Sequence, residues 1–222
     1  MDRRHTDREY EGELESLREQ VLLMGARVEE MMTLALRAFS EQNARLAGST
    51  ITHDRQVDAA EMQIDELCLR VLALRQPVAS DLRFITTTLK LVTDLERIAD
   101  LCVNLCERVG EFEDEPTFRV DGTITQVGAL AQSMVHDALD AFVVGDALKA
   151  EQVMDRDETV DRLHAAIIPE LVSLMTNDPA AVPRSIRLIS IAKYLERIAD
   201  HATNIAEMVV FMVRGQDVRH MS

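Results

Sequence analysis

The hexapeptide Leu95-Glu-Arg-Ile-Ala-Asp100 occurs a second time, without change, as Leu195-Glu-Arg-Ile-Ala-Asp200. Chance identity of six residues in a chain of 222 has a probability on the order of one in a thousand, so an internal repeat is the better explanation. Asn104 and Glu107 recur in the same way 100 residues later, and further matches upstream lie 100 to 103 residues apart. Each copy therefore spans about 100 residues.

Both copies have the composition and spacing of helices. Leu, Ala, Glu, Arg, Met and Gln are abundant, and all six favour helix. The 8 Gly and 5 Pro leave little material for the turns of an all-β fold. Apolar residues recur at helical spacing in six segments, and this periodicity predicts six helices, over about residues 14–42, 44–75, 79–108, 123–144, 146–175 and 184–214.

Proline and glycine punctuate these segments. Pro77 ends the second, because proline cannot continue the hydrogen-bond ladder of a helix. Gly110, Gly145 and Gly215 are placed as helix stops, and Pro169 predicts a kink in the fifth helix. The predicted fold class is all-α, with two tandem repeated three-helix bundles over residues 1–113 and 114–222.

The charge and cysteine content exclude several classes of protein. Against 39 Asp and Glu there are 24 Lys and Arg, a formal net charge of −15 without a basic patch, so we expect no nucleic-acid partner. No run of 18 apolar residues occurs, and we expect no membrane insertion. The charged N-terminal segment has no signal-peptide pattern, and 3 cysteines do not make a disulfide framework. We therefore expect a cytoplasmic location.

Acidic residues line matching faces of the second and third predicted helices. Asp54 and Asp58 are one turn apart on the second helix, and Glu96 and Asp100 are one turn apart on the third. The tight turn near residues 76–77 makes the two helices antiparallel, and at 1.5 Å per residue both pairs lie roughly 30 Å from it. Four carboxylates are therefore predicted to converge at one level of the hairpin.

The second repeat carries a similar but looser set. Its acids lie at comparable distances from the turn at residues 177–183, and they are Asp157, Asp161, Glu196 and Asp200. Glu61 and Asp65 extend the acidic face in the first repeat, but His164 and Ile168 occupy their places in the second. His164 is either a ligand or a surface histidine, and the pattern does not decide between the two.

Convergent carboxylates without thiolate predict an all-oxygen site for a hard divalent cation, either Mg²⁺ or Mn²⁺, with iron where carboxylates bridge. The alternative is an acidic face whose charge is balanced by arginines such as Arg97 and Arg197. Because the acids recur in matching registers of two hairpins, metal binding is the favoured interpretation. Cys102 and Cys106 are expected to pack in the core rather than to bind metal.

Three stretches resemble the PhoU family, bacterial regulatory proteins of phosphate transport. They are the doubled hexapeptide, the turn segment Arg75-Gln-Pro-Val-Ala-Ser-Asp-Leu-Arg83 and the tail Val213-Arg-Gly-Gln-Asp-Val-Arg-His220. The resemblance covers nearly the whole chain from Leu14 onward. It implies two three-helix bundles whose E/D-x-x-x-D motifs bind metal ions through the eight acids named above.

The resemblance also implies a function. Members of this family are cytoplasmic negative regulators of high-affinity phosphate uptake and of the phosphate-starvation response. They are typically homodimers, and they are thought to contact the ATPase of the phosphate ABC transporter and a membrane sensor histidine kinase. No nucleophile–base–oxyanion constellation is found, so we expect no enzyme. The alternative is a divalent-metal-dependent phosphohydrolase in which two ions clamp an in-line displacement.

Overall fold

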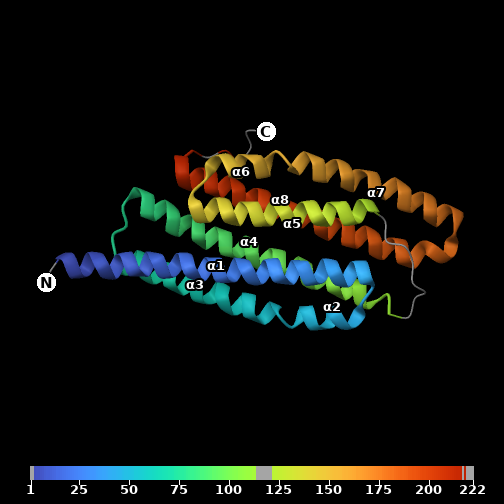
Figure 1. The fold of residues 1–222 in the computed structure, drawn as a ribbon, viewed down its shortest axis with the longest axis horizontal. Coiled ribbons are helices and arrows are strands. Elements are labelled where there is room, and N and C mark those ends of the chain that lie inside the picture. Colours follow the sequence, from blue (N-terminus) through green and yellow to red (C-terminus); the bar gives the residue numbers. More distant parts are fainter. Residues whose placement is uncertain (1–2, 114–121, 217, 219–222) are drawn as a thin grey trace.

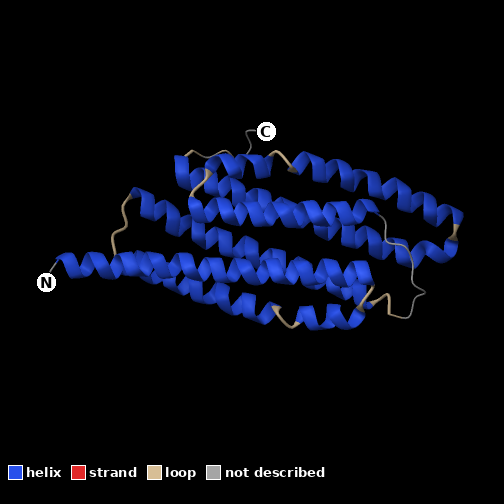
Figure 2. Ribbon diagram, in the orientation of Figure 1, coloured by secondary structure: helices blue, strands red, loops and turns tan. Residues whose placement is uncertain are grey.

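The structure is a computed structural model, and it describes residues 3–113, 122–216 and 218 (Figure 1). Figure 2 shows that the described chain is helical throughout, apart from its turns and connections. The elements are α1 (Arg3–Glu41), α2 (Ala44–Ile51), α3 (Asp54–Leu74), α4 (Ala79–Gly110), α5 (Gly122–Val144), α6 (Ala147–Met154), α7 (Asp157–Asn177), the short 3₁₀ helix η1 (Pro179–Ala181) and α8 (Val182–Arg214).

The second and fifth predicted helices are each divided in two, so these two predictions were wrong as single helices. The first break lies at residues 52–53, after a run of small hydroxyl residues. There the hydroxyls of Ser49 and Thr50 both donate to the Leu46 carbonyl, and that of Thr52 donates to the Ser49 carbonyl. Such side chains compete with the helix for backbone acceptors. The second break, at residues 155–156, occupies the matching place in the other repeat.

The turns that precede α2 and α6 also match. Gln42 has φ 50° and Gly145 has φ 68°, and both lie in the left-handed region that ends a helix. The side chains of Asn43 and Asp146 then cap the next helix by accepting hydrogen bonds from backbone N–H groups. Gly110 is not such a stop, because α4 includes it and ends in right-handed backbone at Glu111.

Proline has different effects at two sites of the second repeat. Pro183 lies in the first turn of α8, where a missing N–H costs nothing, so that helix begins two residues earlier than predicted. The helix α7 continues through Pro169 from its start to its end, and the kink there stays a prediction. The predicted boundary between residues 113 and 114 falls at the edge of segment 114–121, which lies outside the described residues.

The six predicted segments form two three-helix bundles, as expected. In the first bundle α2 and α3 together occupy the place of one helix, and in the second α6 and α7 do so. In Figure 1 the first repeat forms the lower half and the second repeat the upper half, with α2, α3, α6 and α7 along the outer edges. The inner helices run in opposite directions in the two repeats, and α4 packs on α8 while α1 packs on α5. None of the helices described here is long and apolar enough to cross a membrane.

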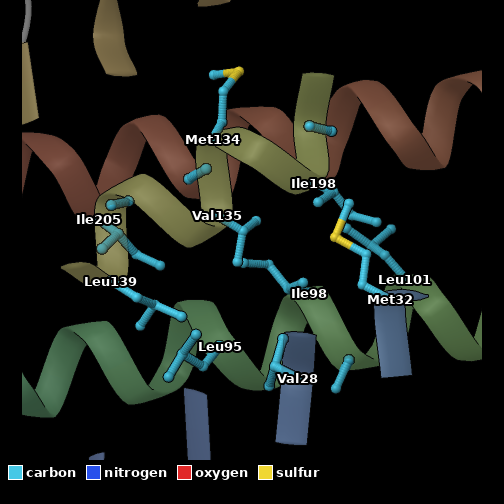
Figure 3. Packing of buried hydrophobic residues seen from close by; sticks show 14 of the residues in the cluster. Val28, Met32, Leu95, Ile98, Leu101, Met134, Val135, Leu139, Ile198 and Ile205 are labelled. Atoms are coloured by element: carbon cyan, nitrogen blue, oxygen red, sulfur yellow. The ribbon is translucent and has the colours of Figure 1, made fainter. Parts of the chain in front are cut away.

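The core lies between the four inner helices. Figure 3 shows side chains from α1, α4, α5 and α8 meeting in one layer, and those labelled are all buried. They are mostly aliphatic, including Leu95 and Ile98 of the first repeated motif and Ile198 of the second. Burial of this kind contributes about 25 cal/mol per Å² of apolar surface, so the core that joins the repeats is a main source of stability.

Two glycines set the distance between α1 and α5. A β-carbon on Gly128 would lie 2.6 Å from Leu36 Cδ2, and one on Gly25 would lie 3.1 Å from both methyl carbons of Leu139. In the repeat, Gly25 corresponds to Gly128 and Leu36 corresponds to Leu139. Each repeat therefore supplies one glycine and one leucine, and each leucine packs against the glycine of the other repeat. The contact is reciprocal, and it requires the absence of a side chain at both glycines.

We predict that Gly128→Val lowers the free energy of unfolding by about 1–3 kcal/mol, because the added carbons overpack the space that Leu36 fills. Urea denaturation followed by circular dichroism measures the change. Leu36→Ala in the same chain recovers part of the loss, since it removes the opposing methyl groups.

Gly12→Val is the matched control, because no atom lies within 4 Å of a β-carbon at Gly12. Its effect on the unfolding free energy should stay within about 0.5 kcal/mol. Equal losses in the Gly12 and Gly128 variants would contradict this explanation, because the loss would then not depend on the approach of α1 to α5.

Candidate functional site

The candidate ligands start at the helix breaks. Asp54 is the first residue of α3 and Asp157 is the first residue of α7. A carboxylate is favoured there, because the N-terminus of a helix carries partial positive charge. Asp58 and Asp161 follow one turn later on the same faces. The breaks therefore place an acid at the start of each outer helix, next to the middle of α4 or α8.

Asp54, Asp58, Glu96 and Asp100 form what we call the first acidic cluster. Burial raises the pKa of Asp54, and the nearby Asp58 and Asp100 carboxylates raise it further. Burial also raises the pKa of Glu96, with Asp100 and Asp58 adding to the rise. The carboxylates are therefore close enough to repel one another. The antiparallel register predicted for this hairpin is the one observed.

Several carboxylate oxygens of this region have no hydrogen-bond partner. Asp54 Oδ1, Glu96 Oε2 and Asp65 Oδ1 are buried and accept no hydrogen bond. Arg97 supplies local positive charge, with Nη1 3.0 Å from Asp100 Oδ2 and Nε 3.3 Å from Glu96 Oε2. One guanidinium therefore balances only part of the charge, since the face also includes Glu61, whose pKa is raised by burial and by neighbouring acids.

Asp157, Asp161, Glu196 and Asp200 form the second acidic cluster. The pKa of Asp200 is raised to about 6, first by burial and then by the Glu196 and Asp157 carboxylates, with a smaller contribution from Asp161. Burial also raises the pKa of Asp157, although a hydrogen bond from the Thr203 hydroxyl, at 3.2 Å, opposes the rise. All four predicted residues of the second repeat therefore also interact.

The second cluster contains a cation that the sequence argument missed. Lys193 Nζ lies 2.7 Å from Glu196 Oε1 and 2.6 Å from Glu196 Oε2, so one ammonium group bonds both oxygens. The signal was present, because Lys193 precedes Glu196 by three residues and such pairs share a helix face. Arg197, which the sequence offered as the counter-charge, forms no ion pair with the carboxylates described in the structure.

His164 is half-buried, and its Nε2 neither accepts nor donates a hydrogen bond within the described residues. A buried imidazole nitrogen without a partner is available to a ligand, but its role stays a prediction. The three cysteines behave as core residues, as expected for Cys102 and Cys106. Burial raises the pKa of the Cys106 thiol to about 12, which disfavours the thiolate that binds metal.

The donors suit a hard divalent cation, because they are carboxylates with buried oxygens that lack hydrogen bonds and with pKa values raised by burial and by neighbouring carboxylates. As positioned, however, no three His, Cys, Asp or Glu side chains within the described ranges are gathered tightly enough to hold one ion. Binding would therefore need side-chain rotation that draws the carboxylates of a cluster together. The eight ligand assignments stay predictions.

Comparison with known proteins assigns the chain to a family. The PhoU domain model matches twice, over residues 21–109 and 124–209, once in each repeat. A phosphate-specific transport system accessory protein PhoU homolog of Pseudomonas aeruginosa is 41% identical over 98% of this chain and 90% of its own length.

Two solved structures share the fold. The crystal structure of PhoU from Pseudomonas aeruginosa superposes with a TM-score of 0.90 at 41% identity, covering 93% of this chain and 100% of that one. The phosphate transport system regulatory protein PhoU from Streptococcus pneumoniae superposes with a TM-score of 0.87 at 30% identity, covering 94% and 99%. These matches confirm the resemblance that the doubled hexapeptide suggested.

We predict that Asp200→Asn stabilises the metal-free protein at pH 7.5 but not near pH 4. A carboxyl whose pKa is raised on folding, here to about 6, resists ionisation in the folded state, so it destabilises the fold once it is ionised in both states. The expected gain is about 1 kcal/mol, or roughly 2–4 °C in Tm, because water screens the exposed part of the side chain.

Differential scanning fluorimetry in a chelating buffer, from pH 4 to 8, measures this effect. Glu30→Gln, which neutralises an exposed carboxylate of α1 outside both clusters, is the control and should change Tm little at any pH. A gain for Asp200→Asn that is the same at pH 4 and pH 7.5 would contradict the explanation, since it would not follow ionisation.

Proposed function

The chain belongs to the PhoU family, and we propose that it is a cytoplasmic negative regulator of high-affinity phosphate uptake and of the phosphate-starvation response. The observation that carries this proposal is the match of both repeats to the family model, together with relatives named as accessory proteins of phosphate-specific transport. Those names support a role in the regulation of phosphate transport. The sign of the regulation and the location belong to the proposal.

We propose that the protein acts as an adaptor rather than as an enzyme. Its partners would be the ATPase of the phosphate ABC transporter and a membrane sensor histidine kinase. Relatives are named accessory or regulatory proteins, and two long helical bundles offer extended surfaces for docking. Homodimer formation, expected from the family, is part of the same proposal.

We propose that both acidic clusters bind a divalent cation, which is Mg²⁺, Mn²⁺ or iron. In the first cluster, buried oxygens without hydrogen bonds on Asp54 and Glu96 support this, and in the second the raised pKa of Asp200 does. A bound ion would add positive charge to that of Arg97 in the first cluster and of Lys193 in the second. Each cluster lies between an outer helix and an inner one, and its carboxylates repel one another. Neutralising their charge would therefore strengthen the packing of α3 on α4 or of α7 on α8.

The rival function is a divalent-metal-dependent phosphohydrolase. The observation in its favour is that carboxylates from two helices interact closely in each repeat. It requires turnover of an aryl phosphate ester by the Mn²⁺-supplemented protein, lost in Asp100→Ala. The adaptor predicts no such turnover even when metal is bound.

We predict that deletion of the gene raises alkaline phosphatase activity several-fold in phosphate-rich medium, because the starvation response loses its repressor. The wild-type gene restores repression when it is returned in trans. A pull-down with the full chain from phosphate-replete membranes should recover the transporter ATPase or the sensor kinase. Recovery of neither, with an unchanged reporter in the deletion strain, would falsify the adaptor proposal.

We predict that 1 mM Mn²⁺ raises the Tm of chelator-stripped protein by about 5–10 °C. A ligand that binds only the folded state at 100 times its Kd contributes about 2.7 kcal/mol, and a chain of this length gains roughly 2–4 °C per kcal/mol. The rise should be largely absent in the double variant Asp58→Asn/Asp161→Asn, which removes one carboxylate from each cluster.

Sodium chloride at equal ionic strength controls for screening of the net charge of −15. Elemental analysis of protein purified without chelator should show at least one metal ion per chain. A ratio near zero, with the same Tm in salt and in Mn²⁺, would instead support acidic faces that serve only as surface charge.

A further inference from the structure

The two acidic clusters differ in charge, although their motifs are identical. On the inner helices, the residue three positions before the motif glutamate is Thr93 in the first repeat and Lys193 in the second. The Thr93 hydroxyl donates to the Leu89 carbonyl of its own helix, at 3.3 Å, so it brings no charge to the first cluster. Lys193 instead binds Glu196 with hydrogen bonds to both oxygens.

The motif glutamate of each cluster contacts one cation, Arg97 in the first repeat and Lys193 in the second, but the hydrogen bonding differs. The Glu196 side chain is 12% exposed and both of its oxygens bond to Lys193, so its acceptors are engaged. The Glu96 side chain is 18% exposed, and Arg97 reaches its Oε2 only at 3.3 Å without forming a hydrogen bond. Arg97 makes its hydrogen bond to Asp100 instead. Glu96 therefore keeps a buried oxygen that is free to accept.

The outer helices add to the difference. On α3 the acidic face continues with Glu61 and Asp65, and the pKa values of both are raised by burial. On α7 the corresponding residues are His164 and Ile168, which supply one imidazole and no carboxylate. The first cluster therefore has more oxygen donors and a less complete counter-charge than the second.

We propose that Lys193 is an internal counter-ion of the second acidic cluster and makes the two clusters unequal, so that the first binds a divalent cation at lower concentration. This rests on the metal binding proposed above. Before Glu196 can bind an ion in the second cluster, Lys193 must give up both of its hydrogen bonds. The Lys193 side chain is 51% exposed, so its ammonium group can move toward solvent. Lys193 thus sets the affinity of the second cluster without itself binding the cation.

Titration of the metal-free full-length protein with Mn²⁺ tests the proposal, with free Mn²⁺ followed by its electron paramagnetic resonance signal. The wild type should show two classes of site. Asp100→Asn should abolish the tighter class and Asp200→Asn the weaker one, which assigns each class to a cluster. Lys193→Thr should tighten the weaker class by about three- to tenfold, as expected for loss of a partly exposed charged pair. Thr93→Lys should weaken the tighter class.

Lys90→Thr is the matched control, because it removes the same charge from α4, where this lysine forms no ion pair with the described carboxylates. It should change the weaker class by less than about twofold, since separated surface charges are screened. If Lys90→Thr tightens Mn²⁺ binding at the weaker class as much as Lys193→Thr does, the effect follows from net charge alone and the proposal is overturned. Equal affinities in the wild type would overturn it as well. Absence of all Mn²⁺ binding would instead refute the metal binding on which it rests.

Discussion

The close approach of α1 to α5 depends on two glycines, Gly25 and Gly128, each opposite a leucine of the other repeat. Because neither position carries a side chain, the two bundles pack closely, and α4 can lie against α8 along the middle of the molecule. That arrangement buries the apolar residues of both repeated motifs between the bundles (Figure 3). The acidic residues of the same motifs are left at the edge of the core, where the first residues of α3 and α7 approach them.

A single repeated sequence therefore serves two purposes. In the first copy Leu95, Ile98 and Ala99 are fully buried, while Glu96 and Asp100 lie at the margin with α3. Burial of the apolar positions fixes the rotation of α4, and that rotation determines where the carboxylates stand. Burial, together with repulsion from neighbouring carboxylates, raises the pKa values of Asp54 and Glu96, a cost that the apolar packing offsets. Such a cost is expected at a site kept for a ligand, and here the proposed ligand is a divalent cation.

Helical periodicity and the repeat predicted the bundles, the hairpin register and the meeting of the acids, because these depend on spacing along single helices. The breaks before Asp54 and Asp157 were not predicted, since they arise where local hydroxyl and arginine contacts compete with the helix. Lys193 was overlooked although its spacing of three residues from Glu196 places both on one helix face, and the side-chain geometry adds that the ammonium group bonds both carboxylate oxygens. The Asp94 to His201 contact between the repeats, at 2.7 Å, joins residues far apart in sequence, and no spacing rule indicates it.

The central claim is that both acidic clusters are cation sites rather than surface charge. Its most direct test is a crystal structure of the chain grown with Mn²⁺, with anomalous scattering recorded at the manganese edge. Anomalous peaks should lie between α3 and α4, bounded by Asp54 and Asp100, and between α7 and α8, bounded by Asp157 and Asp200, with the stronger peak in the first cluster. Peaks only elsewhere on the surface, or none at all, would contradict the account.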